Sequence, residues 1–150
     1  MMPTFFLAGL RSQSLEELYC ALLENDIGLV IDIRLARDSD LGDELRELNG
    51  RRGGQVGYRW LKYFGNPFFD REDLLESYKG YLMGMDKEIE ELYELLIRRR
   101  SCIVDDEASP ERSYRMALGE ALNKRYGITF ADLTMAKELL DKCRERLENQ

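Results

Sequence analysis

Short apolar runs alternate with amphipathic segments along this chain. Residues 4–8 form an apolar run that ends at Gly9, which predicts a buried strand followed by a turn. Ser14 and Glu17 then stand at the spacing of a capping box, and apolar residues at helical spacing follow them. Residues 29–34 form a second apolar run. A β-α-β unit of this length implies parallel strands with a right-handed crossover.

The same alternation continues along the rest of the chain. Further strands are expected at residues 58–61, 102–105 and 128–131, and helices at residues 43–49, 71–83 and 85–99. Ser109 as N-cap, with Pro110 in the first helical position, predicts a helix that ends at Gly127, and Thr134 would cap a last helix. We therefore predict a single α/β domain over residues 1–150, a three-layer sandwich with a mostly parallel sheet of about five strands.

Composition and charge fit such a domain and restrict the kinds of partner that it can bind. A chain of 150 residues, 44% of them hydrophobic, can bury a core without disulfides or metals. The formal net charge of −7 disfavours nucleic acid as a partner, because a phosphate backbone repels an acidic surface. The charged fraction of 34% is typical of proteins from hot environments, where charge networks cost less desolvation.

The cysteines and the N-terminus indicate where the protein resides. Cys20, Cys102 and Cys143 are scattered and lack metal-ligand spacing, which fits the reducing cytoplasm. The N-terminal apolar run is too short for a membrane span, so we expect a cytoplasmic protein without a membrane segment. The chain contains no histidine, which excludes Ser-His-Asp triads, Cys-His pairs and His-ligated zinc within it.

Charged residues follow the expected strands at the point where each strand ends. These points share one edge of a parallel sheet, and ligands of open α/β folds bind at that edge. A helix beginning at Pro110 would offer free N–H groups to an anion there, and arginines would add guanidinium contacts. The candidate ligand-binding residues are Gly9, Arg11, Asp32, Arg34, Glu107 and Arg115.

Each charged candidate also has a purely structural explanation. Asp32 lies within an apolar strand, where an acid would pair with an arginine or cap a turn. Arg115 follows Glu111 by four residues, so an ion pair on a helix surface would account for it. Asp105 and Asp106 could be solvated or could cap the turn after their strand.

Short motifs along residues 4–133 occur in the order and spacing of a known family. They are Gly9, Ser14-Leu15-Glu16-Glu17-Leu18, Asp32-Ile33-Arg34, Tyr58-Arg59-Trp60-Leu61-Lys62-Tyr63-Phe64-Gly65, Tyr81-Leu82-Met83, Glu107-Ala108-Ser109-Pro110 and Arg115. In these motifs the chain resembles the domain-of-unknown-function family 488. The resemblance implies a small α/β domain with a parallel sheet, and it implies no established activity.

The chain departs from that family where reactive side chains are expected. Gly9-Leu10-Arg11 stands where the family usually has Gly-His-Ser, Asp105 replaces a cysteine, and Ser113-Tyr114-Arg115 replaces Cys-His-Arg. The resemblance therefore implies a divergent member that lacks the thiols and imidazoles of the site. The residues that it keeps could hold the shape of a pocket and bind an anion; they are Asp32, Arg34, Glu107, Pro110 and Arg115.

Three functions are compatible with these observations. The favoured interpretation is a binding or regulatory domain without nucleophilic catalysis, cofactor or metal, which takes a small anionic or nucleotide-like ligand. The alternative is a magnesium-dependent phosphoryl-transfer or hydrolytic enzyme that uses the carboxylates of Asp32, Asp105, Asp106 and Glu107. A third is an interaction module, such as a homodimer, with an exposed aromatic patch. That patch would comprise Phe68, Phe69, Tyr78, Tyr81 and the turn Met83-Gly84-Met85, although their spacing also suits a buried helix face.

Overall fold

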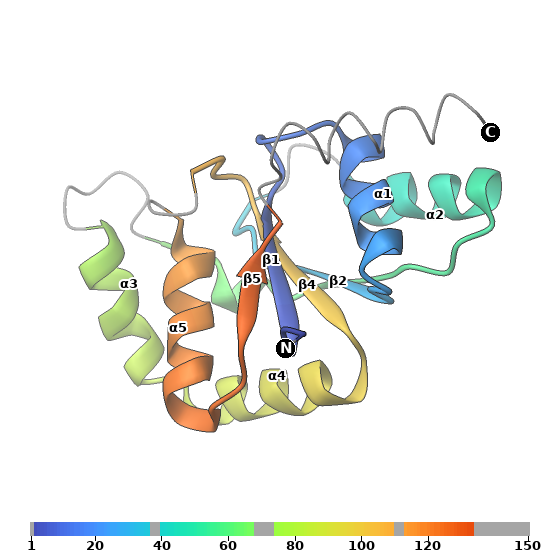
Figure 1. The fold of residues 1–150 in the computed structure, drawn as a ribbon. Coiled ribbons are helices and arrows are strands. Elements are labelled where there is room, and N and C mark those ends of the chain that lie inside the picture. The colour runs from blue at the N-terminus through green and yellow to red at the C-terminus, as the bar shows by residue number, and fades with distance from the viewer. Residues whose placement is uncertain (1, 37–39, 68–73, 110–112, 134–150) are drawn as a thin grey trace.

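The structure is a computed structural model that describes residues 2–36, 40–67, 74–109 and 113–133. Five strands form one sheet in the order β3-β2-β4-β1-β5, and every neighbouring pair is parallel (Figure 1). This confirms the expected α/β class. The strands are β1 (Phe5–Gly9), β2 (Leu29–Asp32), β3 (Gly57–Trp60), β4 (Ser101–Asp105) and β5 (Phe130–Asp132). The helices are α1 (Leu15–Glu24), α2 (Leu41–Arg52), α3 (Leu74–Met83), α4 (Asp86–Arg98) and α5 (Tyr114–Tyr126), with a 3-10 turn at Lys62–Phe64.

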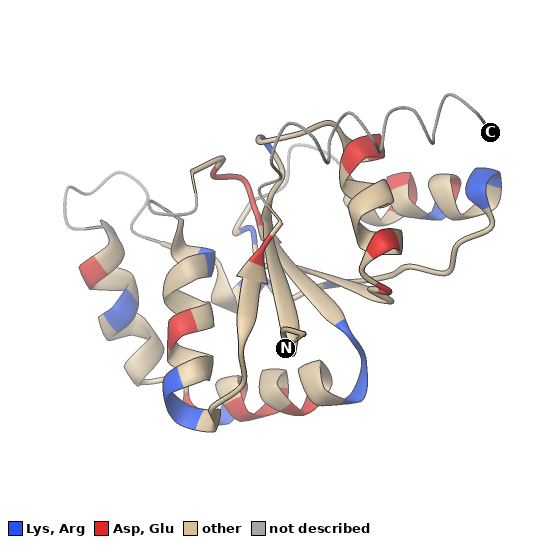
Figure 2. Cartoon of the chain, viewed as in Figure 1, with Lys and Arg blue, Asp and Glu red and all other residues tan. Residues whose placement is uncertain are grey.

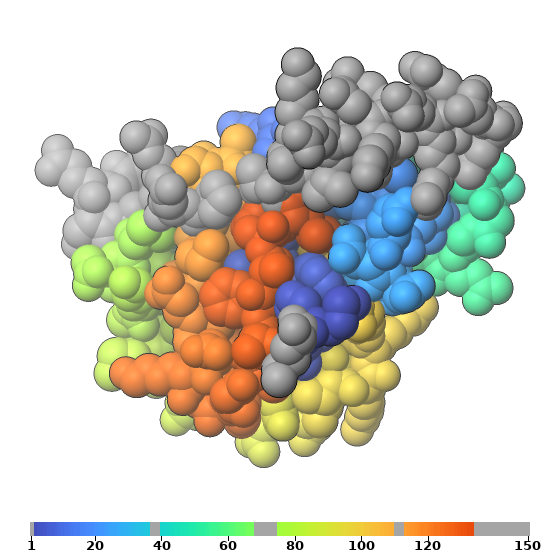
Figure 3. Space-filling model, in the orientation of Figure 1, coloured from blue at the N-terminus to red at the C-terminus, as the bar shows by residue number. Residues whose placement is uncertain are grey.

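Helices cover both faces of the sheet, because alternate strand residues point to opposite sides. On β1, Phe6 and Ala8 pack with helices α1 and α2. Phe5 and Leu7 point the other way and pack with α3, α4 and α5. The two helical layers are visible on either side of the sheet in Figure 1, and Figure 3 shows α5 and β5 packed between α3 and α1. The result is the three-layer sandwich that the sequence predicts.

Local signals fix where most helices begin. The Ser14 side chain accepts a hydrogen bond from the Glu17 main-chain N–H at 3.1 Å, and the Glu17 side chain accepts one from the Ser14 N–H at 3.2 Å. This confirms the capping box that starts α1. Helix α2 is longer than residues 43–49, because Asp40 caps it by accepting from the Asp43 N–H and it continues to a left-handed Gly53.

The aromatic patch expected from the sequence is largely part of the core. Tyr78 is fully buried and donates its hydroxyl to the Phe64 carbonyl at 2.7 Å, and Met85 is buried beside it. Met83 is exposed. Phe68 and Phe69 lie outside the described residues, as do Cys143 and the helix expected after Thr134.

Cys20 and Cys102 are buried, in agreement with packing roles. Burial raises the pKa of the Cys102 thiol, which keeps it protonated. Among the helices that the structure describes, none is long and apolar enough to cross a membrane.

Candidate functional site

The carboxyl ends of β1, β2 and β4 form the candidate site. Strand β4 lies between β1 and β2 in the sheet. From β1 and β2 the chain passes to α1 and α2 on one face, whereas from β4 it passes to α5 on the opposite face. Neighbouring strands whose chains diverge in this way leave a crevice between them. Figure 2 shows acidic positions at this end of the sheet, in the segment after β4 and at the end of β5.

Asp32 and Arg34 form a buried ion pair at the end of β2. The guanidinium donates from Nη2 to Asp32 Oδ2 at 2.8 Å and from Nε to Oδ1 at 3.0 Å. The Arg34 main-chain N–H also donates to Oδ1 at 3.0 Å. Burial lowers the pKa of Arg34, but the Asp32 carboxylate outweighs burial and raises the pKa overall. Asp32 therefore pairs with an arginine, which is the structural role expected of an acid in an apolar strand.

Three aromatic side chains donate hydrogen bonds to this ion pair and to the main chain beside it. The Tyr58 hydroxyl donates to Asp32 Oδ2 at 2.7 Å. The Trp60 indole N–H donates to the Arg34 carbonyl at 2.7 Å, and the Tyr114 hydroxyl donates to the Ile33 carbonyl at 3.3 Å. These contacts fix the main chain after β2, so the direction of the Arg34 side chain is set by β3 and α5 as well.

Arg115 forms a second buried cluster on the other side of β4. Its guanidinium donates to Asp105 Oδ1, to the Glu107 carbonyl, and from Nε to Asp132 Oδ2 at 2.9 Å. The side chains of Arg115 and Asp105 are both 0% exposed. The surface ion pair with Glu111 that the helical spacing suggests is therefore wrong for Arg115, and Glu111 lies outside the described residues.

Asp105 is the most perturbed acid of the site. Burial raises its pKa to about 6, and the neighbouring guanidinium of Arg115 offsets only part of that effect. Asp132 binds the same guanidinium and raises the pKa of Asp105 further. The carboxyl group of Asp105 is thus held in the interior as a partner of Arg115.

Gly9 gives the space that the Arg115 cluster needs. Gly9 pairs with Asp105 in the parallel register of β1 and β4. A Cβ atom at Gly9 would lie 2.1 Å from the Glu107 carbonyl oxygen and 3.0 Å from Nη1 of Arg115. A side chain at this position would therefore displace the main chain that accepts from Arg115.

The start of α5 differs from the sequence prediction. The helix begins at Tyr114, and Ser113 is its N-cap, with the Ser113 hydroxyl accepting from the Met116 N–H at 3.3 Å. Ser109 instead donates its main-chain N–H to Glu107 Oε1 at 3.1 Å, and Pro110 lies outside the described residues. Asp105 Oδ2 accepts from the Arg115 main-chain N–H at 3.2 Å, so an internal carboxylate occupies the helix end expected to bind an anion.

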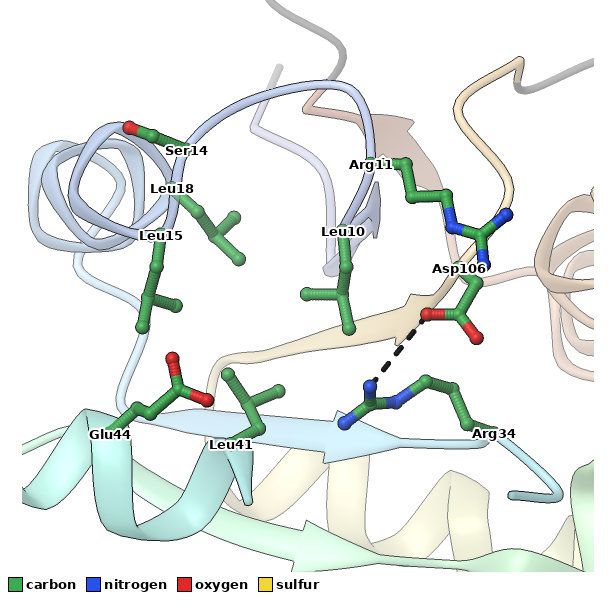
Figure 4. A pocket seen from close by; sticks show the side chains of 9 residues that line it. All are labelled: Leu10, Arg11, Ser14, Leu15, Leu18, Arg34, Leu41, Glu44 and Asp106. Atoms are coloured by element: carbon green, nitrogen blue, oxygen red, sulfur yellow. Dashed lines mark ion pairs between the residues drawn. The ribbon is translucent and has the colours of Figure 1, made fainter. Parts of the chain in front are cut away.

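A cavity of about 210 Å³ opens beside these clusters, on the face that carries α1 and α2. Figure 4 shows Arg11, Arg34 and Asp106 at one side of it and Glu44 at the other. Nη1 of Arg34 lies 3.7 Å from Asp106 Oδ1, while only 2% of the Arg34 side chain is exposed. The described residues that line the cavity are Leu10, Arg11, Ser14, Leu15, Leu18, Arg34, Leu41, Glu44 and Asp106.

The structure divides the expected ligand-binding residues into two groups. Arg11 and Arg34 line the cavity. The other four are not among its lining residues; they are Gly9, Asp32, Glu107 and Arg115, and they hold the main chain around it.

The sequence interpretation missed Glu44 and the four leucines of the cavity. Glu44 lies in the polar stretch between the second and third strands, where only a helix was expected. The leucines are Leu10, Leu15, Leu18 and Leu41. They follow the ordinary apolar periodicity of core positions, so no signal in the sequence separates them from the core.

The four acids expected to hold magnesium do not form a metal-binding group. Asp32 and Asp105 each bind an arginine, and Glu107 accepts from the Ser109 N–H. Within the described residues, which include all four acids, no three acidic or thiol side chains are placed to ligate one metal ion. The geometry therefore gives the magnesium alternative no support.

Comparisons with known proteins identify no relative of this chain. The chain matches no protein-family model, and no curated protein or solved structure is significantly similar to it.

Proposed function

We propose that this protein is a binding domain for a small molecule that carries an anionic group, with the ligand in the cavity at the carboxyl edge of the sheet. The observation that carries the proposal is the position of Arg11. Arg11 is exposed and lines the cavity, and within the described residues it has no ion-pair partner. Arg34 adds positive charge beside it, although Asp32 compensates most of that charge.

The residues of the cavity favour binding over nucleophilic catalysis. Thiols and imidazoles are absent from the described lining. The hydroxyl group of Ser14 lines the cavity, and it accepts a hydrogen bond from the Glu17 main-chain N–H as the cap of α1. The nearby acids Asp32 and Asp105 are bound to arginines, and neither of them lines the cavity.

The size of the cavity narrows the ligand class. Sites for drug-sized ligands usually enclose about 300–1,000 Å³. A cavity of about 210 Å³ is smaller than this range. We therefore narrow the proposal from nucleotide-like ligands to small carboxylates and similar anions.

Ligand-dependent thermal stability tests this function. Hexanoate should raise the Tm, because a ligand that binds only the folded state stabilises it, and AMP should leave the Tm unchanged. Arg11→Gln should lose the response to hexanoate. Arg46→Gln, which changes an arginine of α2 outside the cavity, should keep it. Absence of a shift with any small carboxylate or with phosphate, or an Arg11→Gln variant that responds like the wild type, would overturn the proposal.

We also propose that the chain is a divergent member of the domain-of-unknown-function family 488. Leu10, Asp105, Ser113 and Tyr114 occupy the positions where that family has reactive residues, and all four belong to segments at the carboxyl edge. Their convergence supports a shared site with altered chemistry. A solved family member with a strand order other than β3-β2-β4-β1-β5 would contradict this relationship.

We further propose that the protein is cytoplasmic, that it forms a homodimer and that it comes from a hot environment. Cys20 and Cys102 are buried thiols outside any disulfide, which supports a cytoplasmic location, where disulfides are rare. Light scattering tests whether the protein is a homodimer. Thermal unfolding tests an origin in a hot environment, since mesophilic domains unfold at about 45–65 °C.

A further inference from the structure

Two opposite charges face the cavity from opposite sides. Arg11 follows β1, and Glu44 lies in the first turn of α2. Neither side chain has an ion-pair partner within the part of the chain that the structure describes. In Figure 4 they lie at opposite ends of the cavity, with Leu10 and Leu41 between them.

The other charges of the cavity are already compensated. Arg34 binds Asp32 with two hydrogen bonds and lies 3.7 Å from Asp106. Arg34 and Asp106 also lie at the same end of the cavity as Arg11. The cavity therefore has one end with an available cation and one end with an available carboxylate.

We infer that the ligand is a small zwitterion whose two charges are separated by a short apolar chain, an ω-amino carboxylate. This inference rests on the proposed binding function and specifies its ligand class. The carboxylate of the ligand contacts Arg11, the ammonium contacts Glu44, and the methylene groups pack against the leucines between them.

Desolvation explains why the ligand needs both a carboxylate and an ammonium group to bind tightly. A simple carboxylate would cover Glu44 without pairing it, and a covered charge without a partner is costly. An α-amino acid carries both charges next to one carbon, so it cannot contact both ends at once. A polyanion would meet Glu44 and Asp106 as well as Arg11.

Isothermal titration calorimetry with matched ligands tests this inference. The ligands are the ω-amino carboxylates from β-alanine to aminooctanoate, the carboxylate of the same length for each, and norleucine, the α-amino isomer of ε-aminohexanoate. We expect the best ω-amino carboxylate to bind about tenfold more tightly than its matching carboxylate, as a charge-assisted hydrogen bond provides. Norleucine should bind no better than hexanoate.

Two variants of α2 test whether Glu44 binds the ammonium group of the ligand. Glu44→Gln should remove the preference for the ω-amino group and should raise the affinity for hexanoate, because the neutral amide costs less to cover than an unpaired carboxylate. Glu47→Gln changes a glutamate of the same helix outside the cavity and should keep the preference. If no ω-amino carboxylate binds more tightly than its matching carboxylate, the inference is overturned while the anion-binding function stands. If no ligand binds at all, both are overturned.

Discussion

Arg115 binds Asp105 twice, through its main-chain N–H and through its guanidinium. The first contact fixes the start of α5 at the end of β4, and the second buries both charges. Because the same guanidinium donates to Asp132 on β5, one side chain joins two strands that are separated by β1. The arginine thus organises the carboxyl edge from inside the protein, while Arg11 faces the cavity.

Replacement of Arg115 should be severely destabilising. Arg115→Met would leave the Asp105 and Asp132 carboxylates in the interior without their cation. Removing one partner of a buried ion pair costs about 3–5 kcal/mol, so we expect a loss of that size in the free energy of unfolding. Urea denaturation followed by circular dichroism measures it. Arg46→Met, which breaks an exposed pair with Asp43, should cost less than about 1 kcal/mol. Equal losses in the two variants would show that the buried pair has no special role.

Two glycines should respond in opposite directions to the same substitution. Gly9→Ala would place a methyl group 2.1 Å from the Glu107 carbonyl oxygen, so it should destabilise the protein by about 1–3 kcal/mol or more. At Gly80, within α3, a Cβ atom would meet nothing within 4 Å. Gly80→Ala should therefore stabilise the protein by about 0.5–1 kcal/mol through helix propensity. Thermal unfolding of both variants checks the signs, and a neutral Gly9→Ala would refute the close approach of the loop after β4.

The Tyr58 hydroxyl should contribute measurably to stability. Tyr58→Phe removes the donor to the buried Asp32 carboxylate, and a hydrogen bond to a charged group is worth about 1.5–3 kcal/mol. Chemical denaturation should show a loss in that range. Tyr63→Phe is the matched control, because the Tyr63 side chain is exposed and its substitution should have little effect. A Tyr58→Phe variant as stable as the wild type would mean that Arg34 alone satisfies Asp32.

The fold could be predicted because its signals are local. Apolar runs set β1, β2 and β4, and the Ser14 capping box sets α1. The start of α5 was harder, because Ser109 and Ser113 both precede helix-compatible residues. Ser113 is the N-cap in the structure, where Asp105 accepts the N–H of the first turn. That contact joins residues ten positions apart, so neither serine alone reveals it.

The site could be predicted only in part. Strand ends locate the charged residues, and they do converge at one edge. Which arginine faces the cavity depends on competition among long-range partners: Asp105 and Asp132 enclose Arg115, while Arg11 is left exposed. Glu44 reaches the cavity only because α2 packs beside α1. Those choices depend on tertiary packing, which periodicity does not encode.

Asp105 should make the stability depend on pH between about pH 4 and pH 6. Burial raises its pKa to about 6 in the folded protein, from its usual 3.8. A raised folded pKa means that the folded state binds the proton more tightly. This contribution to stability is therefore complete below the unfolded pKa and is lost as pH rises through about 6. Relative to Asp105→Asn, the free energy of unfolding of the wild type should fall by about 1–3 kcal/mol across this window, as measured by urea denaturation at several pH values. Relative to Asp43→Asn, which changes an exposed acid, the wild type should show little such change. A difference from Asp105→Asn that is constant or rises with pH would show that Arg115 holds Asp105 ionised throughout.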